Sequence, residues 1–240
     1  RVPDTATKVI IGSDGKSIDT KGVKYILNPY DELALEEALR LKEKNGGNVT
    51  AITVGSADAT ETLRNALAMG ADNAVLVKGS DSMDSFAVAE NLADYAKKMN
   101  PDIIFLGKQS VDFDSLQLPS MLAELLGLPS VSVVSKLTID GKNVTAERDI
   151  EGGKELVATT LPCIISAQKG LNDPRYPKLP DIMKAKKKPI EELTAKSVDA
   201  RTVIHKMEIP LKERKSKILG DSVQDIENLV LLLHEDAKVI

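Results

Sequence analysis

The sequence predicts an α/β fold: a parallel, twisted sheet with helices on both faces, followed by an antiparallel hairpin extension and a C-terminal arm. Between residues 49 and 126, short apolar runs alternate with longer segments of helical periodicity, which is the pattern of a parallel sheet with crossover helices. After Gly127 the pattern becomes that of a hairpin, and after Pro189 the chain turns polar. We therefore expect one α/β domain over residues 1–189 and an arm over residues 190–240.

The composition excludes several classes of protein. The net charge of -4 and the isoelectric point near 5.4 argue against nucleic-acid binding. The single cysteine excludes an internal disulfide, and His205 and His234 lack the spacing of metal ligands. No apolar run approaches the ~20 residues that cross a bilayer, so we expect no membrane insertion and a cytoplasmic location, or the mitochondrial matrix in a eukaryote. Aromatic residues make up only 3%, so a bound base or flavin must be contacted mainly by backbone and aliphatic groups, or by a partner chain.

The first part of the chain predicts a hairpin, a helix and a strand. Apolar residues at positions 9–11 and 17–18 flank Ser13-Asp14-Gly15-Lys16, a tight turn around Asp-Gly. This segment is not a P-loop, because the first glycine of that motif falls on Ile10. Asp31 is the expected cap of a helix that ends at Asn45-Gly46-Gly47. A strand follows over residues 49–54.

Three more helices complete the alternating part of the chain. One follows Gly55-Ser56 and ends at Gly70, the second runs from Ser82 to Met99, and the third covers residues 118–126 and ends at Gly127. Apolar strands over residues 74–77 and 103–106 precede the last two helices. Right-handed crossovers should therefore join parallel neighbours.

The polar loop over residues 107–114 is the first candidate for a binding site. It joins an apolar strand to a helix, and such loops place ligand-binding groups at the carboxyl end of a parallel sheet. The same polar residues also suit an ordinary connection that faces water. Asp112 and Asp114 could bind a metal or act as acid and base, but carboxylates before a helix more often cap its free N–H groups, and we favour capping.

The chain after Gly127 changes its periodicity. Residues 131–139 and 144–150 flank Asp140-Gly141 and predict a hairpin, which residues 156–157 continue as a strand. Residues 162–166 predict a buried strand in which Cys163 is a core residue. No nucleophile–base pair, Gly-x-Ser-x-Gly elbow or Gly-x-Gly-x-x-Gly motif after a strand is present, so the sequence does not indicate an enzyme.

Residues 170–189 carry a candidate surface for a protein partner. The apolar segment Leu179-Pro180-Asp181-Ile182-Met183 precedes four lysines, at positions 184 and 186–188. A lysine run is usually a solvated helix face, but an apolar anchor rimmed by charge is how a transient partner is bound and steered. The polar arm that follows ends in a helix with apolar positions at residues 223, 226, 229, 230 and 233. An arm without its own core suggests docking on another chain, because ordering it alone costs entropy.

Four segments together resemble the β subunits of electron transfer flavoproteins. The clearest covers residues 146–157, with Arg148-Asp149 and the paired glycines Gly152-Gly153, and continues through residues 162–166. The others are residues 28–32, Gly107-Lys108-Gln109 with Asp112, and residues 171–176 through Lys188. The resemblance covers essentially the whole chain, and the combination of segments is specific.

The resemblance implies a Rossmann-like, adenine-nucleotide-binding domain that forms a heterodimer with an α subunit. The family carries one FAD, held mostly by the α subunit, and its β subunit holds an AMP. By similarity, Arg148 and Asp149 lie near the FAD, and the phosphate of AMP is bound by N–H groups at the start of the helix after Asp114. The AMP contacts are then Asn28, Val54, Gly55, Ser110, Asp112, Leu116, Gln117 and Leu118.

The resemblance also implies an electron carrier rather than an enzyme. Acyl-CoA dehydrogenases of fatty acid β-oxidation would reduce the shared FAD, and a membrane quinone oxidoreductase would reoxidise it. Leu179 matches the anchor that docks the dehydrogenases, with Pro180, Ile182 and Met183 beside it. Lys184 and Lys187 match lysines that are methylated in some members. The arm over residues 190–240 is expected to dock on the α subunit.

Two departures from the family pattern keep alternatives open. Family members begin with an apolar strand that ends just before the residue matching Arg1, so we expect the natural first strand to be missing here. Phe113, Leu116 and Leu118-Pro119 stand where AMP-binding members have small or polar residues. Electron-bifurcating members, which bind a second FAD in place of AMP and oxidise NADH, share an aliphatic residue at the Leu118 position but have a small one at Phe113, so the loop matches neither pattern fully. A third possibility is a stand-alone adenine-nucleotide-binding protein, which would be a stable monomer.

Overall fold

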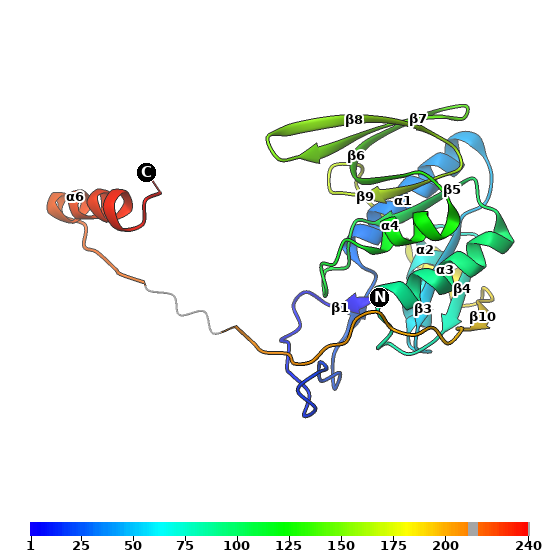
Figure 1. Ribbon diagram of the computed structural model, residues 1–240, viewed down its shortest axis with the longest axis horizontal. Helices are drawn as coiled ribbons and strands as arrows, with labels where there is room; N and C mark the ends of the chain where they lie inside the picture. The colour runs from blue at the N-terminus through cyan, green and yellow to red at the C-terminus, as the bar shows by residue number, and fades with distance from the viewer. Residues whose placement is uncertain (211–215, 240) are drawn as a thin grey trace.

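The computed structural model describes residues 1–210 and 216–239. It confirms the α/β class, with mainly parallel strands between layers of helices (Figure 1). The strands form two ladders and a short pair near the N-terminus. That pair joins β1 (Val2–Pro3) to β2 (Tyr25–Ile26) in antiparallel register. The hairpin expected around Asp14-Gly15 is present as a single bridge between Ile11 and Ile18.

The smaller ladder is parallel throughout and has the order β10-β4-β3. Its strands are β3 (Thr50–Gly55), β4 (Asn73–Lys78) and β10 (Glu191–Thr194). Helices α2 (Ala59–Met69) and α5 (Leu179–Ala185) share a core cluster with β4. We did not expect β10 in the polar arm. It is an exposed strand that is ordered by hydrogen bonds to buried β4, and such pairing needs no apolar periodicity.

The larger ladder has the order β5-β9-β6-β7-β8. Its parallel part is β5 (Ile103–Gly107), β9 (Cys163–Ala167) and β6 (Ser130–Asp140), and β7 (Asn143–Ile150) and β8 (Gly153–Thr160) extend it antiparallel. The predicted hairpin around Gly141 is thus confirmed. Every residue of β9 is buried, which confirms Cys163 as a core residue, and burial raises the pKa of its thiol to about 11.

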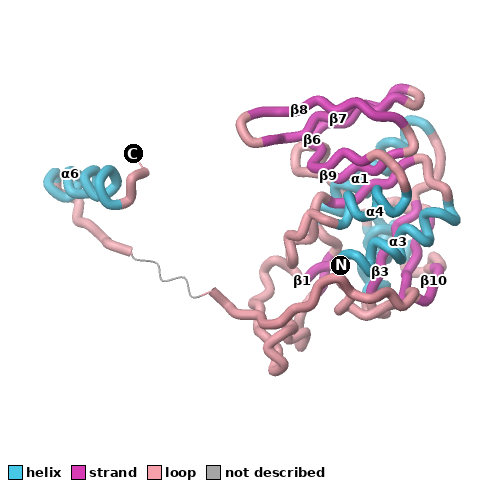
Figure 2. Tube along the Cα trace, in the orientation of Figure 1, coloured by secondary structure: helices cyan, strands magenta, loops and turns pink. Residues whose placement is uncertain are grey.

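Helices cover both faces of the parallel part of the larger ladder, around β5 and β9 (Figure 2). Leu106 and Ile164 pack with α4 (Leu118–Leu126) and α3 (Ser85–Met99). Phe105 and Ala167 pack with α1 (Pro29–Asn45). Because adjacent residues of a strand point to opposite faces, these two clusters lie on opposite sides of the sheet, as the near-continuous apolar strands predict.

Two helix starts differ from the sequence expectation. Asp31 does not cap α1, because the helix already begins at Pro29, with Asn28 before it. Helix α3 begins at Ser85 rather than Ser82, because the carboxylate of Asp84 accepts a 2.9 Å hydrogen bond from the amide of Ala87. A polar side chain thus caps the start of α3, whereas Asn28 makes no capping bond with its side chain at the start of α1.

The arm has two parts that differ in their contacts. Its first part follows the body: the amide of Lys196 donates to Asn91 (2.7 Å), that of Arg201 to Asp84 (2.7 Å) and that of Met207 to the carbonyl of Gly15 (2.8 Å). The predicted distal helix is present as α6 (Val223–Leu231) with a π-helical turn, η1 (Leu232–Asp236), and neither has a buried residue. Figure 1 shows α6 standing apart from the body. None of the described helices is long and apolar enough to cross a membrane.

Candidate nucleotide site and partner surface

Asn28 ties the start of α1 to the loop after β5. Its side chain is 1% exposed, and its Nδ2 donates to Asp31 Oδ2 and to the carbonyl of Gln109, each at 2.8 Å. Its Oδ1 accepts from the amide of Val111 at 3.2 Å. The side chain therefore uses both donors and its acceptor on groups from two distant segments, which fixes the loop relative to the helix.

Gly107 permits the close approach of these two segments. A Cβ at this position would lie 2.7 Å from the carbonyl carbon of Tyr30 and 2.8 Å from the amide of Asp31. No side chain fits against that backbone. The amide of Gly107 instead donates to Asp31 Oδ1 at 2.6 Å, so Asp31 is used here rather than as a cap. Lys108 places its Nζ 4.9 Å from the centre of the Tyr30 ring.

The rest of the loop faces outward. Asp112, Leu116 and Gln117 are exposed, and Ser110 and Leu118 are half-buried. Asp114 and Leu116 have φ angles of 50° and 51°, in the left-handed region. For a branched residue such as Leu116 this conformation costs about 1 kcal/mol or more. A strained, exposed, apolar residue in a polar loop is typical of a segment shaped for binding rather than for stability.

Neither carboxylate of this loop caps α4, so the capping expectation was wrong. Asp112 Oδ1 accepts from the amide of Phe113 (3.0 Å), and Asp114 Oδ1 accepts from Gln109 Nε2 (2.5 Å). The left-handed turn after Asp114 delays the helix to Leu118, and Gln117 before it makes no capping bond with its side chain. No group of carboxylates, histidines or cysteines in the described ranges could hold a metal ion. The start of α4 therefore presents its amides without a carboxylate cap.

Val54 and Gly55 lie at the end of β3, in the other ladder. The adjoining amide of Ser56 donates to Asp81 Oδ1 at 3.0 Å. Arg1 bonds to both Ser56 Oγ (3.0 Å) and Asp81 Oδ2 (2.7 Å), and its guanidinium stacks 4.0 Å from the Tyr25 ring. Tyr25 belongs to β2, which leads into Asn28. Arg1 thus links the Gly55 turn to the segment that carries Asn28.

Arg148 and Asp149 lie in β7, level with the carboxyl end of β5. The registers pair Gly107 with Ala167, Ala167 with Val134, and Val134 with Arg148, so these residues form one row across the sheet. Three strand spacings place Arg148 roughly 14 Å from Gly107. Arg148 Nε lies 3.4 Å from Glu155 Oε2, and Asp149 Oδ1 accepts from Ser135 Oγ at 3.3 Å. The structure therefore sets this pair at the same end of the sheet as the loop, but apart from it.

The expected partner surface lies on and after α5. Leu179 and Met183 have exposed fractions of 73% and 53%, and Pro180, Lys184 and Lys187 are also exposed. Ile182 differs, because it packs inward on the cluster of α2 and β4 that includes Leu63. We name the exposed set, Leu179, Pro180, Met183, Lys184 and Lys187, the α5 surface.

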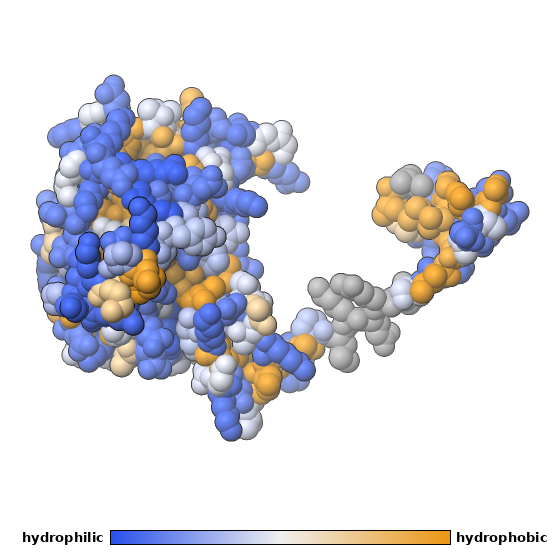
Figure 3. All heavy atoms as spheres, turned by 180° about the vertical axis from the view of Figure 1, so that it is seen from behind, coloured by the Kyte–Doolittle hydropathy of each residue, from blue (hydrophilic) through white to orange (hydrophobic). Residues whose placement is uncertain are grey.

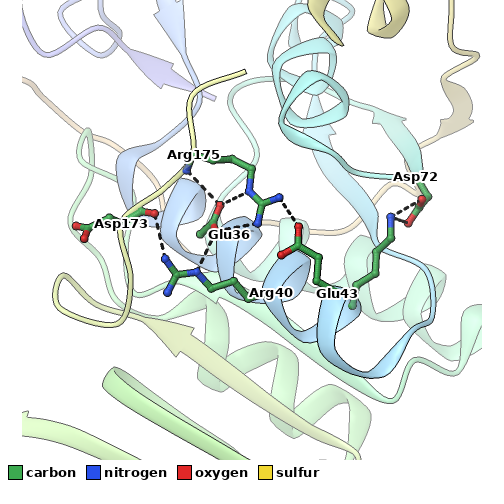
Figure 4. Close-up of polar contacts among 7 residues, drawn as sticks. Glu36, Arg40, Glu43, Asp72, Asp173 and Arg175 are labelled. Carbon is green, nitrogen blue, oxygen red and sulfur yellow. Dashed lines mark hydrogen bonds and ion pairs between the residues drawn. The ribbon is translucent and has the colours of Figure 1, made fainter. Parts of the chain in front are cut away.

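An ion-pair network that the sequence did not reveal lies before α5 (Figure 4). Arg175 Nε and Nη2 donate to Glu36 Oε2 and Oε1 at 2.8 and 3.0 Å, and its Nη1 donates to Glu43 at 2.5 Å. Arg40 Nε also donates to Glu36 Oε1, at 3.0 Å. Burial raises the pKa of Glu36, but the hydrogen bonds from Arg175 and Arg40 outweigh burial, so its pKa lies below the usual value. The apolar stripe expected on α1 gave no indication that the carboxylate of Glu36 would be buried beside it.

The chain is similar to known proteins over most or all of its length. Residues 16–198 match the family model of the electron transfer flavoprotein domain. The chain is 45% identical to the electron transfer flavoprotein subunit beta of Bacillus subtilis, over the whole chain and 97% of that protein. It is 39% identical to the subunit beta of Mus musculus (96% covered) and 40% identical to the mitochondrial subunit beta of Arabidopsis thaliana (97% covered), again over the whole chain. The chain belongs to the β subunits of the electron transfer flavoprotein family.

Proposed function

We propose that this β subunit of an electron carrier binds AMP at the loop held by Asn28 and closes over a FAD shared with an α subunit. Acyl-CoA dehydrogenases reduce that flavin, and a membrane quinone oxidoreductase reoxidises it. The FAD supplies the electron transfer when bound. The residues of this chain bind nucleotide, orient the flavin edge and recognise partners, in the cytoplasm or the mitochondrial matrix.

One observation supports the nucleotide assignment above all: Asn28 and Gly107 fix the strained loop in front of α4 against the start of α1. The loop ends at a helix start whose amides lack a carboxylate cap, and such amides favour a phosphate group. Ser110 and Gln117 supply hydrogen-bonding groups on the same loop, and Leu116 and Leu118 supply the aliphatic contacts that an adenine needs when aromatic residues are scarce. Val54 and Gly55 complete the site from β3.

Arg148 and Asp149 suit a position beside the flavin. They lie level with the carboxyl end of the parallel strands, where open α/β sheets bind their ligands. Arg148 Nε is buried without a hydrogen bond, and the charge of the guanidinium is paired with Glu155 at 3.4 Å. A guanidinium and a carboxylate beside a flavin ring would bias its electrostatics without taking part in covalent chemistry.

Releasing the nucleotides by denaturing the purified heterodimer tests this proposal. We expect FAD and AMP in equal amounts, identified by mass. Two FAD per heterodimer and no AMP would overturn the AMP site and favour a bifurcating subunit that oxidises NADH. If this chain alone is purified as a compact, nucleotide-loaded monomer that hydrolyses ATP, the carrier assignment itself fails.

A variant of the α5 surface tests dehydrogenase docking. Leu179→Ala removes an exposed side chain that is expected to become buried in the partner, worth about 1.5 kcal/mol or roughly a tenfold rise in KM for an acyl-CoA dehydrogenase. The flavin content should not change. Met99→Ala, which truncates another exposed apolar side chain (exposed fraction 53%) at the end of α3, is the control and should leave KM unchanged. Equal loss of FAD in Leu179→Ala would show that this segment supports the fold instead.

A further inference from the structure

We propose that Arg175 and Arg64 are positioning residues that hold α5 from both ends and so fix the orientation in which the α5 surface meets its partner. The inference rests on the proposed docking function of that surface. The partner it fits carries an apolar pocket for Leu179 and Met183 with acidic groups around the rim, because exposed Lys184, Lys186 and Lys187 lie beside them.

Helix α5 cannot hold its own orientation. It has seven residues, and helices of that length are unstable in water without tertiary contacts. Its N-terminal neighbour Lys178 makes no capping bond with its side chain, and of its apolar side chains Leu179 and Met183 are exposed while Ile182 and Ala185 pack inward. Its direction must therefore be set by the segments on either side.

Arg175 fixes the segment before the helix. Its guanidinium forms a two-point contact with Glu36, whose side chain is only 4% exposed, and its own amide donates to the same carboxylate at 3.1 Å. Asn172 adds a bond from Nδ2 to the carbonyl of Leu33 at 3.0 Å. Both acceptors belong to α1, so the chain reaches α5 from a fixed point on a long helix.

Arg64 fixes the other end. Its Nη1 donates to the carbonyl of Ala185 at 2.6 Å and also to that of Lys188. The carbonyl of Ala185 is at the C-terminal end of α5, where a guanidinium is favoured by the helix dipole, and that of Lys188 lies in the turn that follows. Ala185 is 2% exposed against α2, and Lys188 Nζ donates to the carbonyl of Ala71 at 2.9 Å. Ala185 and Lys188 are thus held on the body, and the α5 surface between these two fixed ends remains exposed to a partner.

A rigid α5 lowers the entropy that is lost when the partner binds. We test this in the intact heterodimer with Arg175→Lys, which keeps the charge but cannot make the two-point contact with Glu36. Arg64→Lys is the second variant, in case the first fails to assemble. Lys98→Ala, which removes one exposed ion pair with Asp94, is the control. Each is combined with Leu179→Ala.

We expect Arg175→Lys to speed hydrogen exchange of the amides at residues 176–188 and to raise KM for the dehydrogenase about fivefold, with kcat and flavin content unchanged. Because Arg175 acts through Leu179, the double variant should be no worse than Leu179→Ala alone. Faster exchange with unchanged KM, or effects that multiply in the double variant, would overturn the inference. If Leu179→Ala itself leaves KM unchanged, the docking proposal fails, whereas the exchange result still decides whether Arg175 orders α5.

Discussion

Asn28→Ala is expected to destabilise the protein by about 3 kcal/mol and to release the bound nucleotide. The substitution leaves the amide of Val111, the carbonyl of Gln109 and the carboxylate of Asp31 without their buried partner. It also opens a cavity at a position that is 1% exposed. The loop over residues 107–118 then loses its tie to α1, so the nucleotide contacts on it are no longer held together.

Thermal unfolding of the heterodimer and the AMP released per protein measure the two effects. Asn73→Ala is the matched control, because this amide is exposed and its contact to Thr50 Oγ1 is 3.5 Å long. Its effect should stay within about 0.5 kcal/mol, with AMP retained. If the Asn28→Ala protein is destabilised but keeps its full AMP content, Asn28 supports the fold without holding the nucleotide, and the assignment of the AMP site to this loop is contradicted.

Replacing Ile226 and Val230 by Ser is expected to weaken assembly with the α subunit about a hundredfold. These residues lie four apart on α6, with exposed fractions of 57% and 52%, and Figure 3 shows apolar side chains gathered on this helix. Burying two such side chains in a partner is worth about 3 kcal/mol. Because the FAD is shared, flavin should be lost together with the α subunit.

Sedimentation of the heterodimer over a range of concentrations checks this expectation. Gln224→Ser with Asn228→Ser is the matched control, since these residues have the same spacing on the opposite, polar side of α6. Neither pair touches the capping box of Ser222 and Asp225. If both double variants assemble equally well, α6 does not dock on the α subunit. Assembly would then need at most the first part of the arm, which follows the body.

The elements that the sequence predicts well are those whose signal is local. Strand and helix periodicity located β3 to β5 and α1 to α4, and Asp140-Gly141 located the hairpin of β6 and β7. Strand β10 was missed because its order comes from pairing with β4, and the start of α1 was misplaced because Asp31 bonds to a strand end far along the chain. Asp112 and Asp114 were misread as caps, since the left-handed turn at Asp114 and Leu116 is invisible in residue types.

The sequence by itself determined the fold class, the order of most elements, the family and the segments of the proposed site. Those properties follow from apolar periodicity and from residue types within short windows. Only the tertiary structure decided that Gly107 packs on Tyr30, that Asn28 holds the loop, and that Arg175 reaches Glu36 across the domain. Such contacts join residues that are distant along the chain, so their partners depend on the packing of helices on the sheet and not on neighbouring residues.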